Sequence, residues 1–119
     1  MFKKITLACV GALMLATASG AWAQAYPAKP VKLLVGFPAG GGLDVLARII
    51  GQRVSEQWGQ QIIVENKPGA GSNIAGEIAA KSAPDGYTLL HTNIALMSIN
   101  PALYGKMSFA PMKDLTPIV

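Results

Sequence analysis

The sequence predicts an α/β fold built on a parallel sheet, with the element order βαβαβ. Three observations support this prediction: short apolar runs of strand length, amphipathic segments between them, and a glycine-rich loop after each of the first two runs. Strands that alternate with helices form parallel sheets joined by right-handed crossovers. The chain has 119 residues, which is the length of one small domain.

The first strand and helix are predicted over residues 31–58. Residues 31–37 form a nearly continuous apolar run, typical of a strand buried on both faces. Residues 43–58 repeat apolar side chains at helical spacing, which predicts a helix with one face turned to the core. Gly59 is the expected C-terminal stop. The inward stripe consists of Leu43, Leu46, Ala47, Ile50, Val54 and Trp58.

The pattern then repeats. A second strand is predicted over residues 61–65, followed by a helix over residues 74–82 with Ile74 and Ile78 facing inward. Either Ser72 or Asn73 is expected to cap that helix.

Pro84-Asp85-Gly86 predicts a turn, because each of the three residues favours one turn position. A third strand follows over residues 87–92, and a short helix is expected over residues 93–98. Residues 107–113 are predicted to be irregular. The chain stops on β-branched residues with no polar tail, which suggests an incomplete unit.

The first 23 residues have the three parts of a secretory signal peptide. Lys3 and Lys4 precede an apolar run over residues 5–18, and Ala21-Trp22-Ala23 follows. Cleavage is expected after Ala23, or after Ala25 as the alternative. The product would be an exported chain over residues 24–119, with no later segment long enough to span a bilayer.

Removing the signal changes what the composition implies. The formal net charge of +4 includes the two leader lysines, so nucleic acid is not expected as a partner. The only cysteine, Cys9, lies in the leader, and His91 is the only histidine. No metal site and no cofactor are therefore expected. His91 is expected to be a core or rim residue rather than a catalytic base, and the scattered acids indicate no enzyme.

The first candidate site is the loop between the first strand and the first helix. Ligands of open α/β sheets bind at the carboxyl ends of strands, and a helix N-terminus favours an anion. A carboxylate or phosphate would fit such a loop. The alternative is a tight turn in which Asp44 ties up the first amides of the helix. The candidate residues are Pro38, Ala39, Gly40, Gly41, Gly42 and Asp44.

The second candidate loop occupies the same position after the second strand. Two such loops on one sheet edge would converge on a shared cleft. Thr92 and Asn93, at the end of the third strand, would add a hydroxyl and an amide group on that edge, but either could equally be a cap or loop residue. Nucleotide motifs do not fit, because neither loop continues as Gly-Lys-Ser/Thr or supplies the third small residue of the dinucleotide fingerprint. The added candidates are Gly69, Ala70, Gly71, Ser72, Asn73, Thr92 and Asn93.

Residues 26–119 resemble the tripartite tricarboxylate transporter substrate-binding proteins, also called Bug-type extracytoplasmic solute receptors. The matching motifs run in the order of that family. They are Tyr26-Pro27 with Lys29-Pro30; Phe37-Pro38-Ala39-Gly40-Gly41-Gly42 with Asp44; Leu46-Ala47-Arg48; Val64-Glu65-Asn66-Lys67-Pro68-Gly69-Ala70-Gly71 with Asn73-Ile74; Pro84-Asp85-Gly86-Tyr87-Thr88-Leu89-Leu90; Ile99-Asn100-Pro101-Ala102-Leu103-Tyr104; and Lys113-Asp114.

The resemblance implies a two-lobed periplasmic binding protein of type II, the Venus flytrap fold. Residues 24–119 would be the N-terminal part of its first lobe, since family members are much longer. Backbone amides and waters of the two loops would hold a small carboxylate: a dicarboxylate, tricarboxylate, amino acid or aromatic acid. Leu43 departs from the small or hydroxyl residue often found there.

The expected function is therefore a periplasmic solute receptor that delivers a carboxylate to integral-membrane permease subunits. It would need no cofactor, metal or covalent chemistry. The alternatives are a small α/β nucleotide-binding or hydrolytic domain, and a non-functional truncated product.

Overall fold

The computed structural model describes residues 25–119. The predicted signal peptide and its cleavage after Ala23 lie outside the described residues. Within residues 25–119, none of the helices combines the length and the apolar character needed to cross a membrane.

A three-stranded parallel sheet forms the centre of the fold. Its strands are β1 (Val31–Val35), β2 (Ile62–Asn66) and β3 (Thr88–His91), in the order β2-β1-β3. β1 pairs in parallel with both neighbours, so that Val35 lies opposite Asn66 on one side and His91 on the other. The predicted parallel βαβαβ unit is confirmed.

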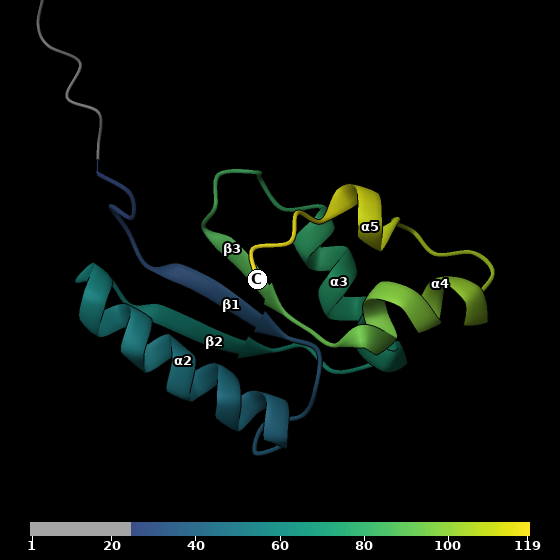
Figure 1. Ribbon diagram of the computed structural model, residues 1–119, viewed down its shortest axis with the longest axis horizontal. Coiled ribbons are helices and arrows are strands. Elements are labelled where there is room, and N and C mark those ends of the chain that lie inside the picture. The colour runs from purple at the N-terminus through teal and green to yellow at the C-terminus, as the bar shows by residue number, and fades with distance from the viewer. Residues whose placement is uncertain (1–24) are drawn as a thin grey trace, which may run out of the picture.

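Helices cover both faces of the sheet. The connection from β1 to β2 runs in one direction and that from β2 to β3 runs back across β1, so right-handed crossovers place the two helices on opposite faces. Figure 1 shows α2 (Gly42–Trp58) on one face and α3 (Asn73–Ala80) on the other. The shorter elements are η1 (Ala70–Ser72), a 3₁₀ turn; η2 (Ala95–Ile99), a π-helical turn; α4 (Asn100–Leu103); and α5 (Pro111–Asp114).

The expectation of irregular structure over residues 107–113 is wrong at its end, where α5 forms. Pro111 occupies the first helical position, where its fixed φ suits a helix. The Asp114 carboxylate accepts a hydrogen bond from the Ala110 amide at 2.7 Å. These two local devices explain a helix of a single turn.

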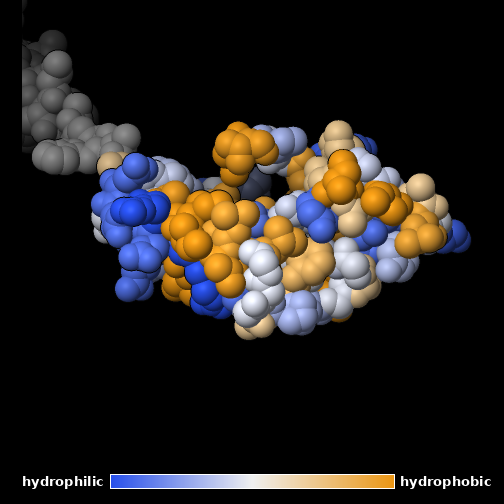
Figure 2. Space-filling model, turned by 60° about the horizontal axis from the view of Figure 1, so that its bottom comes forward, coloured by the Kyte–Doolittle hydropathy of each residue, from blue (hydrophilic) through white to orange (hydrophobic). Residues whose placement is uncertain are grey.

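The inward stripe predicted for α2 is partly wrong. Leu46 and Ile50 are 45% and 43% exposed, whereas Ala47 is buried as predicted, together with Asp44 and Gly51. The reason is close packing: a Cβ at Gly51 would lie 3.2 Å from Ile62 Cγ2, so α2 approaches the sheet through its small residues. Figure 2 shows that apolar side chains are left on the outer surface of the molecule. The exposed apolar residues of α2 are Val45, Leu46, Ile49, Ile50 and, at 40% exposure, Trp58.

α3 packs in the same way, so its predicted inward pair is also wrong. Ile74 and Ile78 are 45% and 39% exposed, and the buried residues are Ala75 and Gly76. A Cβ at Gly76 would lie 2.6 Å from Phe109 Cζ. The helix therefore turns its small face to the interior because a bulky face would not fit against Phe109.

Two predicted local signals are confirmed. Gly59 ends α2 in the left-handed conformation (φ 66°) and its amide bonds to the Ser55 carbonyl. In the turn before β3, the Asp85 carboxylate accepts from the Tyr87 amide at 3.0 Å. Both features depend on residues close in the sequence.

Candidate functional site

The candidate residues gather at the carboxyl edge of the sheet. We call residues 36–41 loop 1, which follows β1, and residues 67–72 loop 2, which follows β2. Because the strands are parallel, both loops and the residues after β3 meet at this edge. A Cβ placed on Gly36 would lie only 1.7 Å from Ser72 Oγ, so the two loops pack directly against each other.

Loop 1 is held by the carboxylate of Asp44, which is 2% exposed. Its Oδ2 accepts from the Gly40 amide at 2.8 Å and from Arg48 Nε at 3.0 Å. Its Oδ1 accepts from Asn66 Nδ2 at 2.9 Å and lies 3.0 Å from Arg48 Nη2. The Arg48 hydrogen bond, followed by those from Gly40 and Asn66, lowers the pKa of Asp44 to about 2, so it is ionised at neutral pH.

Asn66 connects this cluster to the sheet. Its Nδ2 also donates to the Phe37 carbonyl at 3.0 Å, and its Oδ1 accepts from Arg48 Nη2 at 3.1 Å. The three side chains therefore close a ring, in which Asn66 and Asp44 hold the two ends of the segment from Phe37 to Gly40. The sequence analysis did not assign Asn66 or Arg48 to the site. Both residues lie in the family motifs next to the loops, and this position was the signal that could have identified them.

The first amides of α2 are left without a capping side chain. The N-cap residue is Gly41, and within residues 25–119 no acceptor is bonded to the amides of Gly42, Leu43 or Asp44. The alternative in which Asp44 ties up these amides is wrong, because its carboxylate turns back to Gly40. The Gly41 amide bonds within the loop, to Pro38 O at 3.3 Å.

Loop 2 is shaped by its backbone. Four consecutive residues have positive φ: Gly69 (132°), Ala70 (47°), Gly71 (62°) and Ser72 (77°). The Ser72 amide donates to the Gly69 carbonyl at 3.0 Å, and the Asn73 amide bonds to the Ala70 carbonyl. Neither predicted cap is observed: Ser72 is at the N-cap but its left-handed backbone differs from the extended one that a capping hydroxyl uses.

A buried amide side chain braces loop 2 from a distance. Asn100, which is 4% exposed, donates from Nδ2 to the Gly71 carbonyl at 2.8 Å and to Asn73 Oδ1 at 2.7 Å. The sequence analysis named Asn100 only within the family motif at residues 99–104. Its role was not readable because its partners lie far back in the chain.

Three buried side-chain atoms at this edge have no hydrogen-bond partner in the described part of the chain. They are Ser72 Oγ, His91 Nε2 and Thr92 Oγ1. His91 lies opposite Val35 in the sheet, and Gly36, the residue after Val35, packs against Ser72. The three unpaired atoms therefore lie around the ends of adjacent strands. An unpaired buried polar atom costs free energy and requires a partner.

The remaining candidate residues are either exposed on the surface or held by contacts within the fold. Asn93 acts as a local cap, because its Oδ1 accepts from the Ala95 amide at the start of η2 at 3.1 Å. His91 is half-buried in an edge strand, in agreement with its expected place in the core or rim. The exposed candidates are Pro38, Ala39, Gly40, Gly41, Gly42, Gly69, Ala70 and Gly71.

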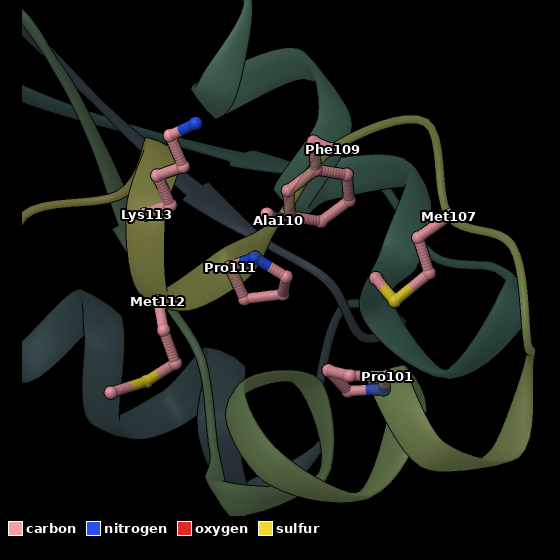
Figure 3. Close-up of a pocket in the computed structure, with 7 residues that line it drawn as sticks. All are labelled: Pro101, Met107, Phe109, Ala110, Pro111, Met112 and Lys113. Carbon is pink, nitrogen blue, oxygen red and sulfur yellow. The ribbon is translucent and has the colours of Figure 1, made fainter.

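A separate groove of about 370 Å³ lies on the α5 side of the molecule and contains none of the predicted site residues. Figure 3 shows that its labelled side chains are mostly apolar. The lining consists of Pro101, Met107, Phe109, Ala110, Pro111, Met112 and Lys113. Among residues 25–119, no group of three metal-ligating side chains is found either.

Comparison with known proteins assigns the family. The family described as tripartite tricarboxylate transporter family receptor matches residues 46–119. The chain belongs to this family. The BugT protein of Bordetella pertussis is 38% identical over 97 residues, which is 81% of this chain and 30% of that protein. The predicted resemblance is thus confirmed, and the family is one of transport receptors.

Solved receptor structures share the fold. A Rhodopseudomonas palustris protein with adipate matches at a TM-score of 0.76 and 37% identity, over 79% of this chain and 31% of that one. MatC from the same organism, with bound malate, matches at 0.74 and 36% identity, over 78% and 32%. The chain therefore spans about a third of the length of the relatives it matches.

Proposed function

We propose that loops 1 and 2 form one side of a binding site for a small carboxylate, and that the chain serves as part of a periplasmic receptor. In this proposal the receptor passes its ligand to membrane permease subunits. Residues 1–23 would direct export and be removed after Ala23. The sequence match to a transport receptor family supports this proposal at the level of the family.

The observation that carries the proposal is the set of unpaired donors at the carboxyl edge of the sheet. The amides of Gly42, Leu43 and Asp44 have no acceptor within the described residues, and Ser72 Oγ is buried without a partner. A ligand carboxylate presents two acceptor oxygens, which suit amide and hydroxyl donors. The positive end of the α2 dipole favours the same charge.

The topology supports a shared site. The connection from β1 runs to β2 on one side, and the connection from β2 returns across β1 to β3, so the strand order reverses at β1. Open α/β sheets bind ligands where the strand order reverses. Loop 1 follows β1, and Thr92 and Asn93 follow β3. We propose that the exposed glycines let a ligand approach the backbone, with Asp44 acting through the shape of loop 1. The relatives that contain adipate and malate carry ligands of this chemistry.

The test is a nuclear magnetic resonance titration of the ¹⁵N-labelled chain with adipate. We expect shifts at the amides of residues 42–44, in loop 2 and at residues 92–93. Adipamide, the neutral analogue, should produce none. Because these loops supply one side of a site, we expect affinity weaker than micromolar. Equal shifts with adipamide, or shifts confined to the groove around Met107 and Met112, would contradict the proposal.

A pair of serine variants sharpens this test. Ser72→Ala removes the unpaired hydroxyl and should weaken adipate binding severalfold. Ser82→Ala is the control, because its hydroxyl donates to the Ile78 carbonyl at 2.7 Å, beyond the end of α3 away from the loops. The Ser82 variant should bind as the wild type does.

A further inference from the structure

We propose that Arg48 is the counter-charge of loop 1: it neutralises Asp44 so that a buried carboxylate can position the loop without repelling an anionic ligand. This inference rests on the proposed function, and it names a positioning residue of the same site. Arg48 would act through Asp44 and not by touching the ligand.

The need for a counter-charge follows from the place of Asp44. It lies in the first turn of α2, and its own amide is one of the three left without an acceptor. Its carboxylate holds the Gly40 amide at 2.8 Å and is almost fully buried. An unbalanced negative charge there would oppose a second carboxylate at the same helix end, because water screens buried charges poorly.

The guanidinium group of Arg48 is positioned to neutralise that charge. It lies one turn further along α2, with Nε 3.0 Å from Asp44 Oδ2 and Nη2 3.0 Å from Oδ1. This two-point contact matches the planar guanidinium and is unavailable to lysine. The third bond, from Nη2 to Asn66 Oδ1 at 3.1 Å, fixes the orientation of the fork.

A second carboxylate near this edge also has cationic partners. Glu65 at the end of β2 lies 3.5 Å from Lys32 and 3.6 Å from Lys67. Among residues 25–119, Arg48 is the cation that forms an ion pair with Asp44. Geometry and charge are thus divided: Asn66 and Asp44 hold the loop, and Arg48 removes the net charge.

The experiment compares three variants of the full chain. Arg48→Gln leaves Asp44 uncompensated, and Asp44→Asn combined with Arg48→Gln removes both charges. Arg53→Gln is the matched control, since Arg53 pairs with Glu56 at 3.2 Å on the exposed side of the same helix. Adipate affinity is measured for each at low and high salt, together with hydrogen exchange of the Gly40 amide.

We expect Arg48→Gln to weaken adipate binding roughly threefold to tenfold at both salt concentrations, since salt screens a buried charge poorly. The double variant should recover most of the affinity, and Arg53→Gln should match the wild type. The Gly40 amide should stay protected in Arg48→Gln. A merely structural role would not give rescue by removing a second charge.

Two results would overturn the inference and are distinct from failure of the proposed function. If the wild type binds adipate and the Arg48 and Arg53 variants are indistinguishable, Arg48 is not a counter-charge. If Arg48→Gln loses the Gly40 protection and the double variant is not rescued, Arg48 is structural. If the wild type shows no difference between adipate and adipamide, the proposed function itself fails, and the counter-charge role fails with it.

Discussion

The two glycine loops have similar sequences and equivalent positions, yet the fold holds them in different ways. Loop 1 has one positive φ, at Gly40 (82°), and is fixed by a ring of three side chains, two of them charged. Loop 2 has four positive φ values in a row and is braced by the neutral side chain of Asn100. Loop 1 is therefore shaped by electrostatics and loop 2 by backbone conformation.

This difference matters for an anion site. A charged ring around loop 1 sets the local field as well as the loop geometry. A neutral brace beneath loop 2 sets geometry alone. The following predictions test this division, from the largest expected effect to the smallest at neutral pH.

Gly36→Ala should have the largest effect, because it adds a methyl group where loops 1 and 2 pack against each other. The new Cβ would lie 1.7 Å from Ser72 Oγ and 2.8 Å from Ser72 Cα, so loop 2 must move. We expect the free energy of unfolding in urea to fall by about 2 kcal/mol or more. Gly42→Ala, whose Cβ meets no atom within 4 Å, should change it by less than about 0.5 kcal/mol. Similar losses in both variants would show that the loops do not pack as described.

Asn100→Ala should damage loop 2 and leave loop 1 intact. It removes two hydrogen bonds and leaves the Gly71 carbonyl without its donor, which should cost about 1–3 kcal/mol of unfolding free energy. Amide hydrogen exchange should then rise in loop 2 and stay unchanged at Gly40. Faster exchange in both loops would mean that they form one cooperative unit.

Ala70→Gly should stabilise the chain slightly. Ala70 has φ 47°, a left-handed conformation that costs an alanine about 1 kcal/mol and glycine little. Glycine also increases the conformational entropy of the unfolded chain, which offsets part of this effect. We therefore expect the free energy of unfolding, measured by thermal denaturation, to rise by about 0.5 kcal/mol. Ala79→Gly, within α3, should instead lose about 1 kcal/mol. Changes of equal sign would argue against strain in loop 2.

Loop 1 should contribute a change of stability in acid and none at neutral pH. The pKa of Asp44 is lowered from 3.8 to about 2, so its stabilising contribution is complete above about pH 4 and is lost as the pH falls towards 2. A ¹³C titration should place the midpoint of its carboxyl near 2, and Arg48→Gln should raise it. A midpoint near 3.8 in the wild type would contradict the ring of hydrogen bonds.

The sequence predicted those features of the fold and of the candidate site that depend on near neighbours. The glycine loops, the Asp85 turn and the Gly59 stop each follow from the preferences of a few consecutive residues. The parallel order of strands followed from the alternation of strand and helix, and with it the single edge where the loops meet.

The side chains that hold the loops could not be predicted in the same way. Asn66 reaches Asp44 across 22 positions, and Asn100 reaches Gly71 across 29. An asparagine has many possible partners in a sequence, and only the folded backbone selects one. The missing cap at Ser72 has a related cause, since its left-handed backbone is imposed by loop 2.

By itself, the sequence determined the α/β class, the family motifs and the position of both glycine loops. Only the tertiary structure decided which faces of α2 and α3 are buried. Periodicity placed Ala47 correctly. It favoured Leu46 and Ile50 over Gly51 on α2, however, and Ile74 and Ile78 over Ala75 and Gly76 on α3. The physical reason is the short distance between the elements: Ile62 and Phe109 already fill that space, so only small residues fit there.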